Sequence, residues 1–371
     1  MEQLQEKKQK SKRIFYLDAL RALAIITVIT YHVILTTRYL IFNDISEPNL
    51  SWFIGIFFYN SFRFGVDLFL ILAGALSLGR VWTIKSFLSR RIPRIVEPYV
   101  FWLVITITAY LSAQFFAPEI FHVIDSFTLI NIWNFILSAF QSAFPYFYSY
   151  WFFWMILGTY LIMPIFNKWL LHSELEEAEY FLVFWLITSL FTFTLNTPFP
   201  VKLNYFVSPI GMVVLGYYLR HTKRKIFDNL YVPIILIAVA VILQISISLF
   251  FFNTDDFYRF NRYSILMAIE VSGIYLLFKN LDTKHSFKKV PRIIRETFKK
   301  AVSSIAKYSY GFYLIQLCII ILTIQFLKYA HLFTRFKLVF FSVTLFTIIL
   351  SWIIMAILNR VKYINKFIGA K

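Results

Sequence analysis

The run FYLDALRALAIITVITYHV, residues 15–33, is long and apolar enough to cross a bilayer, yet it carries Asp18, Arg21 and His32. Arg or Asp at the centre of a membrane helix costs roughly 2.5–3.5 kcal/mol on insertion scales, so such residues usually serve a function. The spacing from Arg21 to His32 corresponds to about 20° beyond three helical turns and a rise of about 16 Å. Both side chains therefore lie on one stripe, one toward each leaflet, which suits a site reached from both sides of a membrane.

The composition points to the same class of protein. Of the 371 residues, 59% are hydrophobic and 15% are charged, whereas soluble domains have about 45–50% apolar and about 25% charged residues. A net charge of +18 would suggest nucleic acid for a soluble chain. Here the basic residues lie in short loops between apolar runs, so membrane topology explains them and no nucleic-acid partner is predicted. The single Cys318 excludes an intrachain disulfide and a cysteine-cluster metal site, and no metal site is predicted.

Runs of about 20 apolar residues predict an all-α integral membrane protein with about ten transmembrane helices in one bundle. A further segment, 127–144, is apolar but interrupted by Asn131, Asn134 and Gln141. We interpret it as interfacial or re-entrant. The ten predicted spans are 14–37, 62–80, 95–116, 147–168, 180–197, 203–220, 230–252, 262–281, 308–329 and 336–359.

The distribution of basic residues predicts the orientation of these spans. An even number of spans puts both termini on one side, and that side carries 28 of the 37 Lys and Arg residues, against 8 on the other. Because cytoplasmic loops are enriched in Lys and Arg, both termini are predicted to be cytoplasmic in a multi-pass protein of the cell membrane. The predicted organisation is a basic tail over 1–13, a membrane domain over 14–359 and a second basic tail over 360–371.

His32 and Asp67 are the candidate catalytic pair. Asp67 lies in GVDLF, residues 65–69, near the outer end of the second span and at a depth similar to that of His32. A carboxylate beside an imidazole fixes its tautomer and raises its basicity, as a general base requires. Two alternatives stay open. His32 could be a hydrogen-bonded packing residue, and Asp67 could pair with Arg63, four residues earlier on the same helix face.

Arg91 and Arg94 are the candidate phosphate ligands. They lie in RRIPR, residues 90–94, at the cytoplasmic start of the third span. Residues three apart share a helix face, so the two guanidinium groups can bind one phosphate-bearing ligand. The alternative is that they only anchor the helix at the cytoplasmic surface. Glu270 is a further charge within a span, and the sequence assigns it no partner.

These stretches together resemble the membrane-bound acyltransferase-3 family. Residues 17–32 are similar to its first-helix signature, an Arg followed by ten residues and a His. Two positions differ from the family pattern: Gln316 stands where many members have His, and Ser149-Tyr150 replaces a His that often precedes the Trp-Phe pair. The other similar segments are GVDLF (65–69), RIPR (91–94), WFFWMILGTYLIMP (151–164), LGYYL (215–219) and SYGFYLIQ (309–316).

The resemblance implies a ten-helix enzyme that transfers an acyl group, typically acetyl, from cytoplasmic acyl-CoA to a hydroxyl of a surface or lipid-linked glycan. Acyl-CoA is then a donor substrate, and no permanently bound cofactor is expected. His32 would be the base, oriented by Asp67, while Arg91 and Arg94 would hold CoA phosphates. Arg21 would line the path of the pantetheine arm or balance charge within it. The alternative is an exporter or flippase of a polysaccharide or lipid without acyl chemistry. The partners expected are membrane lipid, acyl-CoA and the glycan acceptor, and a homo-oligomer stays open.

The predicted orientation can be tested by cysteine labelling. We expect an impermeant thiol reagent to label a cysteine at position 256 in intact cells, and one at position 290 only after permeabilisation, because these positions lie in an outer and an inner loop. The parent protein, with only Cys318, measures the background. Reversed labelling of either position would overturn the orientation and the cytoplasmic placement of Arg91 and Arg94.

Overall fold

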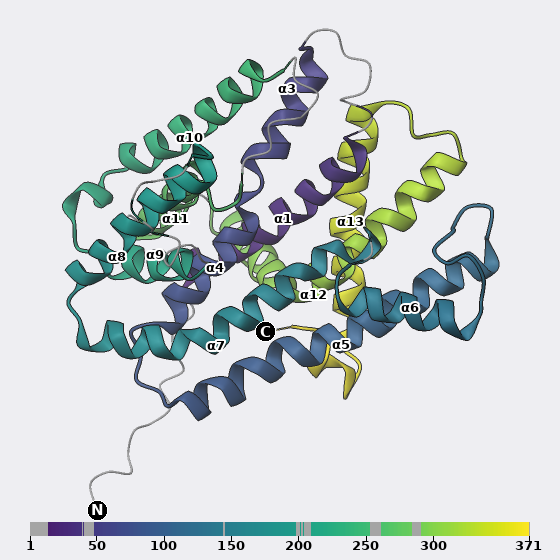
Figure 1. Ribbon diagram of the computed structural model, residues 1–371, viewed down its shortest axis with the longest axis horizontal. Coiled ribbons are helices and arrows are strands. Elements are labelled where there is room, and N and C mark those ends of the chain that lie inside the picture. The colour runs from purple at the N-terminus through teal and green to yellow at the C-terminus, as the bar shows by residue number, and fades with distance from the viewer. Residues whose placement is uncertain are drawn as a thin grey trace, which may run out of the picture.

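The computed structural model describes residues 14–370 except 39, 41–47, 144, 198–200, 202, 204–208, 253–260 and 284–290. The described residues form helices and connections, with no strand among them (Figure 1). This confirms the prediction of an all-helical protein. The predicted N-terminal tail, residues 1–13, lies outside the described residues.

The α-helices follow one another along the chain with a few short helical turns between them. Two π-helical stretches, η1 (Phe57–Ser61) and η3 (Ser189–Thr194), extend α-helices, and 3₁₀ turns occur at η2 (Pro145–Tyr150), η5 (Lys225–Asp228) and η7 (Ile364–Lys366). The α-helices are α1 (Phe15–Thr37), α3 (Leu50–Ile56), α4 (Phe64–Ser77), α5 (Ile84–Phe116), α6 (Leu129–Phe140), α7 (Trp151–His172), α8 (Leu175–Thr188), α9 (Ile210–His221), α10 (Tyr231–Phe250), α11 (Ile265–Thr283), α12 (Arg292–Tyr329) and α13 (Phe336–Leu358).

Helix α1 is the centre of the bundle. It packs mainly against α12 and α4, and also against α13 and α11 (Figure 1). Its buried residues recur on all sides of the helix, and Leu20, Ala24, Ile25 and Ile29 have no exposed surface. A helix that is buried all round cannot face lipid with its polar residues. On this stripe Asp18 and His32 are buried by protein, whereas 35% of the Arg21 side chain is exposed.

Seven helical segments of the described chain are long and apolar enough to cross a membrane. The predicted spans 180–197, 203–220 and 262–281 coincide with helices α8, α9 and α11, which do not meet that standard. The protein is thus a helical membrane protein, and the number of ten crossings stays a prediction. The seven are Phe15–Thr37, Leu50–Ser77, Ile84–Phe116, Tyr146–His172, Tyr231–Phe250, Arg292–Tyr329 and Phe336–Leu358.

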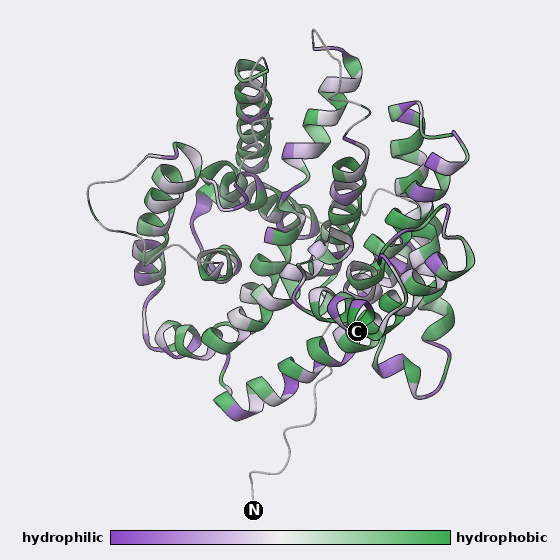
Figure 2. Cartoon of the chain, turned by 45° about the vertical axis from the view of Figure 1, so that its right-hand side comes forward, coloured by the Kyte–Doolittle hydropathy of each residue, from purple (hydrophilic) through white to green (hydrophobic). Residues whose placement is uncertain are grey.

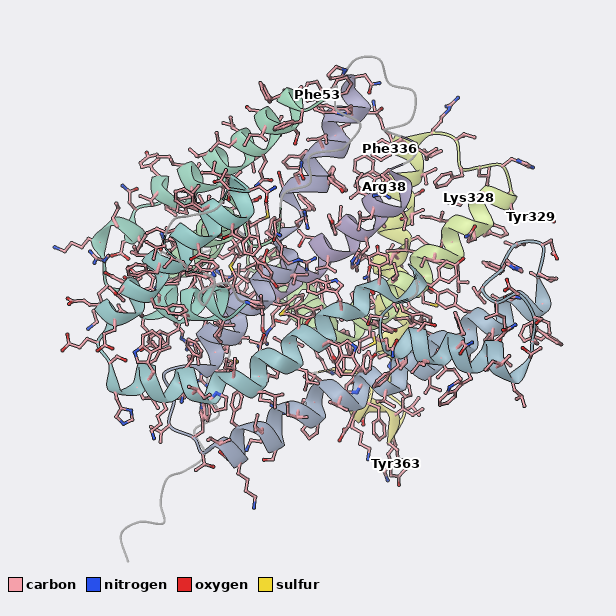
Figure 3. All side chains as sticks on the ribbon, in the orientation of Figure 1. Arg38, Phe53, Lys328, Tyr329, Phe336 and Tyr363 are labelled. Carbon is pink, nitrogen blue, oxygen red and sulfur yellow. The ribbon has the colours of Figure 1, made fainter. Side chains whose placement is uncertain are left out.

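The two ends of the molecule carry the residues that the predicted orientation assigns to opposite sides. Arg38 and Lys328, which are predicted to be outside, lie toward one end of the molecule together with Phe336, the first residue of the last predicted span. Tyr363 of the C-terminal segment lies at the other end (Figure 3). Hydrophobic residues cover most of each helix, while hydrophilic ones gather mainly at helix ends and connections (Figure 2). This arrangement agrees with the predicted topology, which stays a prediction.

Helix α6 accounts for the interrupted apolar segment 127–144. It has 12 residues, which span about 18 Å, less than the roughly 30 Å of the hydrocarbon core. Its N-terminus is capped by Thr128, whose hydroxyl accepts a hydrogen bond from the Asn131 backbone at 3.3 Å. Leu129, Ile130 and Trp133 are exposed. A short helix with an exposed apolar face fits the interfacial interpretation.

The C-terminal segment returns to the bundle. After α13 the chain turns back, and Ile368 has no exposed surface. The indole Nε1 of Trp102 in α5 donates a hydrogen bond to the Ile368 carbonyl at 3.3 Å. Gly369 follows with φ of +78°, a conformation that favours glycine. The sequence predicted a basic tail over 360–371, and part of that tail packs against the transmembrane helices.

Two glycines allow α4 and α9 to approach closely. A Cβ added at Gly74 would lie 1.8 Å from the carbonyl oxygen of Val213, and one added at Gly216 would lie 2.0 Å from that of Ile71. Each glycine thus packs directly against the backbone of the opposite helix. Small residues permit this kind of close packing between membrane helices, where van der Waals contact drives association.

This packing predicts that Gly74→Ala lowers the stability of the protein by about 1–3 kcal/mol, the usual cost of overpacking. Thermal unfolding of the purified protein in detergent measures the loss. Gly158→Ala is the matched control, because a Cβ there would meet no atom within 4 Å. It should leave stability unchanged or raise it by up to about 1 kcal/mol through helix propensity. Equal unfolding temperatures for the two variants would contradict the packing described for α4 and α9.

Candidate active site

A basic cavity lies at the end of the bundle where α1 begins. It has a volume of about 370 Å³, within the range of about 300–1,000 Å³ typical of ligand sites. We call it the inner cavity. Among the described residues, five cationic and no acidic side chains line it. They are Arg21, Arg80, Arg91, Arg94 and Lys307, and the rest of the wall includes Phe69, Leu72, Phe152, Ile156, Tyr160, Tyr310 and Tyr313.

The start of α5 positions Arg91 and Arg94. Thr83 caps this helix, its hydroxyl accepting from the Ser86 backbone at 3.1 Å while Ser86 Oγ accepts from the Thr83 backbone at 3.1 Å. Arg91 Nη2 donates to Ser77 Oγ at 2.7 Å, which ties the start of α5 to the end of α4. The sequence prediction that Arg91 and Arg94 face one ligand site agrees with their shared cavity.

Arg80 adds to the positive potential of the inner cavity. It lies in the connection between α4 and α5. Burial, together with the nearby charges of Arg220 and Arg91, lowers the pKa of its guanidinium group. The mutual repulsion of these cations favours an anion between them, because an anion relieves it. Arg80 was not among the site residues predicted from the sequence.

Arg21 reaches the inner cavity from α1. One of its guanidinium nitrogens lies 3.8 Å from Asp18 Oδ1, one helical turn earlier. Asp18 is buried, with 3% of its surface exposed. Arg21 lines the same cavity as Arg91 and Arg94, and its place along the path of the pantetheine arm stays a prediction. Asp18 balances part of the charge of Arg21 within the bundle.

A second cavity, the outer cavity, contains His32. Its volume is about 180 Å³. Arg63 and Arg262 line it, with the Arg63 guanidinium carbon 5.7 Å from the centre of the Tyr31 ring and that of Arg262 3.6 Å from the centre of the Trp151 ring. Its other lining residues are Val28, Leu35, Phe62, Val66, Tyr148, Ser149 and Tyr313. The cavity therefore combines aromatic walls with polar and cationic groups.

Tyr313 lines both cavities. Its side chain is buried, and its hydroxyl donates a hydrogen bond to the Ser149 carbonyl. Its ring lies edge-on to Phe152 with the ring centres 5.2 Å apart, and stacks with Tyr310 at 6.2 Å. Tyr313 thus stands between the inner and outer cavities, and we call this position the junction. Tyr313 lies within SYGFYLIQ, residues 309–316, and no role was predicted for it from the sequence.

His32 makes a hydrogen bond to a residue that the sequence did not assign. Gln316 Nε2 lies 2.5 Å from His32 Nδ1. Both residues are buried, His32 with 5% and Gln316 with none of its surface exposed. His32 also lies edge-on to Tyr148, with ring centres 5.5 Å apart. The contact of His32 with Gln316 joins α1 to α12 at the depth of the outer cavity.

Asp67 makes no direct hydrogen bond to either of the partners considered for it from the sequence. It is fully buried near the start of α4, and neither carboxylate oxygen has a hydrogen-bond partner among the described residues. Arg262 and Arg63 act on it through their charge, without a direct hydrogen bond. The structure therefore pairs Asp67 directly with neither His32 nor Arg63. The hydrogen bond to the imidazole of His32 is made by Gln316, and the role of Asp67 in orienting His32 stays a prediction.

Glu270 has a partner on the neighbouring helix. Gln244 Nε2 of α10 donates to Glu270 Oε2 of α11 at 2.8 Å. Both residues are buried, with 2% of Glu270 and none of Gln244 exposed. Glu270 lines neither cavity. The pair satisfies part of the polar surface of two packed membrane helices.

A sequence signal existed for the residues that were missed on α12. Tyr310, Tyr313 and Gln316 are spaced three residues apart, so they lie close to one helix face. In the structure this face borders the inner cavity at Tyr310, the junction at Tyr313 and His32 at Gln316. The spacing was visible in the sequence, whereas the helix that this face contacts was not.

Comparison with known proteins adds a family assignment to this geometry. A family model described as an acyltransferase domain matches residues 14–356, nearly the whole chain. No curated protein and no solved structure matches. With the seven apolar helices, the family match makes the protein a membrane acyltransferase that transfers groups other than aminoacyl groups. The chain belongs to the acyltransferase-3 family.

Proposed function

We propose that this protein takes an acyl group, most simply acetyl, from cytoplasmic acyl-CoA and transfers it to a hydroxyl of a cell-surface or lipid-linked glycan. One observation carries the proposal. A cavity that five of the described cationic residues line and a cavity lined by the buried His32 share one lining residue, Tyr313. Such a pair of cavities allows a donor and an acceptor to approach one another from opposite sides of a membrane.

The inner cavity suits the CoA part of the donor. CoA carries a diphosphate and a ribose phosphate, and guanidinium groups bind phosphate with two parallel hydrogen bonds. Arg91 and Arg94 are the proposed phosphate ligands, with Arg80 adding charge. The apolar wall that includes Leu72 and Ile156 suits the pantetheine arm, which then extends past Arg21 toward Tyr313.

The junction favours a short acyl group. Tyr313 and Phe152 lie edge-on to one another at the inner end of the junction, and the outer cavity beyond them has only about 180 Å³. An acetyl group needs little space, whereas a long acyl chain would compete with the acceptor for the same volume. The aromatic and polar wall of the outer cavity suits a sugar, because ligand sites combine such surfaces with a few oriented polar groups.

The proposed reaction uses His32 as a general base. Its Nε2 takes the proton of the acceptor hydroxyl while the oxygen attacks the thioester carbonyl carbon. A C–O bond forms and the C–S bond breaks. The CoA sulfur leaves with the electron pair and receives the proton from the imidazolium group, so that the products are the ester and free CoA. This scheme consumes no co-reactant and returns His32 to its neutral form.

Family membership decides between the two functions that the sequence left open. An exporter or flippase without acyl chemistry would need no acyltransferase domain, and that domain covers residues 14–356. The finer statements, that the donor is acetyl-CoA and the acceptor a glycan, belong to this proposal. The positive charge of the inner cavity supports a CoA donor, and the aromatic and polar wall of the outer cavity supports a sugar acceptor.

The proposal predicts that His32→Ala lowers acyl transfer by at least about 100-fold, the lower bound for a positioned general base. His32→Gln should fail as well, because an amide keeps the hydrogen bond but cannot accept the proton. Mass spectrometry of surface glycans from cells that express each variant measures the acetyl groups. His172→Ala is the matched control, since His172 is exposed at the end of α7 and hydrogen-bonds only to the Lys168 carbonyl among the described residues.

Two results would contradict this role. An active His32→Gln protein would show that only a hydrogen bond is needed and would remove the base assignment. A loss of surface glycan with full acetylation of the glycan that remains would indicate transport rather than transfer. Expression of each variant, measured in purified membranes, controls for misfolding.

A further inference from the structure

We propose that Gln316 is the positioning residue of His32. In this arrangement the side-chain carbonyl of Gln316 accepts the Nδ1 proton of His32, and Nε2 is left unprotonated toward the outer cavity. The inference rests on the proposed function for the role of His32 as a base. It concerns a residue to which the sequence analysis assigned no part in acid–base chemistry.

The geometry fixes which edge of the imidazole is available to a substrate. The amide of Gln316 lies 2.5 Å from Nδ1 and has no exposed surface. His32 lines the outer cavity, and Gln316 lines neither cavity. The Nδ1 edge therefore faces the interior of the bundle, between α1 and α12. The opposite edge, which carries Nε2, is the one left to face the acceptor.

The chemistry of the base selects one orientation of the amide. A neutral imidazole carries one proton, so a protonated Nδ1 leaves Nε2 as the acceptor. The two ends of a Gln amide have nearly the same shape, and half a turn about the last side-chain bond exchanges them. With the NH₂ group against Nδ1, the proton would be on Nε2 and His32 could not act as a base. With Oε1 against Nδ1, Nε2 is free to accept.

The same orientation of the Gln316 amide also suits His32 after it has taken the proton. In the imidazolium form both ring nitrogens carry a proton, so Nδ1 can only donate. In the structure Gln316 Nε2 lies against Nδ1, and Oε1 has no hydrogen-bond partner among the described residues. The half turn that brings Oε1 to Nδ1 therefore breaks no hydrogen bond of Oε1, and Oε1 can then accept the Nδ1 proton. A single amide orientation thus supports His32 before and after it takes the proton. A neutral amide does this without placing a second buried charge beside the imidazole.

Other groups near His32 do not replace Gln316. Asp67 has no hydrogen-bond partner among the described residues, and the rings of Tyr31 and Tyr148 contact His32 with ring centres 5.9 Å and 5.5 Å away. Arg262 acts on His32 through its charge, and Arg63 lines the same cavity. Both are donors and cannot accept a proton from Nδ1.

Nitrogen NMR tests the arrangement without requiring activity. The full-length protein is labelled with ¹⁵N in its six histidines and reconstituted in lipid, and the signal lost in His32→Gln identifies His32. We expect neutral His32 to carry its proton on Nδ1. In Gln316→Leu it should move to Nε2, the nitrogen that a free imidazole prefers. Ser351→Ala is the control, since Ser351 is buried on α13 and lines neither cavity.

A second variant tests the catalytic consequence. In Gln316→Glu a carboxylate replaces the amide, still accepts from Nδ1, and stabilises the imidazolium form. Activity should be retained, while the acidic limb of the pH–rate profile should move to higher pH by roughly one to three units. The rate is measured as CoA thiol released from acetyl-CoA by membranes that contain the protein. Gln316→Leu should lose most of this rate.

The outcomes separate this inference from the proposed function. A proton on Nε2 in the wild-type protein, or an unchanged tautomer in Gln316→Leu, would overturn the role of Gln316 whatever the activity. An unmoved acidic limb in an active Gln316→Glu protein would also overturn it. If the wild-type protein released no thiol from acetyl-CoA, the donor proposal would fail, and the tautomer measurement would still decide the Gln316 contact.

Discussion

Charged and polar groups inside a bilayer need partners within the protein, because the hydrocarbon offers none. Helix α1 carries Asp18, Arg21 and His32 along one stripe, so other helices must surround it. The structure meets this requirement with α4, α12, α13 and α11. Helix α10, which has no charged residue, exposes a largely apolar surface instead. The two cavities lie near the two ends of the α1 stripe, where the surrounding helices leave space.

Helices α1 and α12 together connect the two cavities. Along α1, Arg21 borders the inner cavity and His32 the outer one, separated by a rise of about 16 Å. Along α12, Tyr310 lines the inner cavity, Tyr313 lines both cavities and Gln316 contacts His32. In the proposed function, α5 adds the phosphate ligands at one end. His32, Tyr313, Gln316, Arg91 and Arg94 are then held by helices, which favours precise placement.

Much of this organisation could be predicted from the sequence. Hydropathy located the helices, and residue spacing indicated that Arg21 and His32 lie at different depths and that Arg91 and Arg94 share a face. Periodicity gives the depth and face of a residue on its own helix, but not which helix that face contacts. For this reason Asp67 was expected beside His32 on depth alone, and the contact with Gln316, 284 positions away in the chain, was not foreseen. The junction at Tyr313 and the return of Ile368 to the bundle depend on tertiary packing in the same way.

The central claim is that donor and acceptor meet at Tyr313 from opposite sides of the membrane. Electron cryomicroscopy of the full-length protein in lipid nanodiscs, with a thioether analogue of acetyl-CoA that cannot be cleaved, tests it directly. The account predicts that the CoA phosphates lie against Arg91 and Arg94 in the inner cavity, with the carbonyl of the analogue at Tyr313 on the side of His32. Phosphates bound in the outer cavity, or a carbonyl directed away from His32, would contradict it.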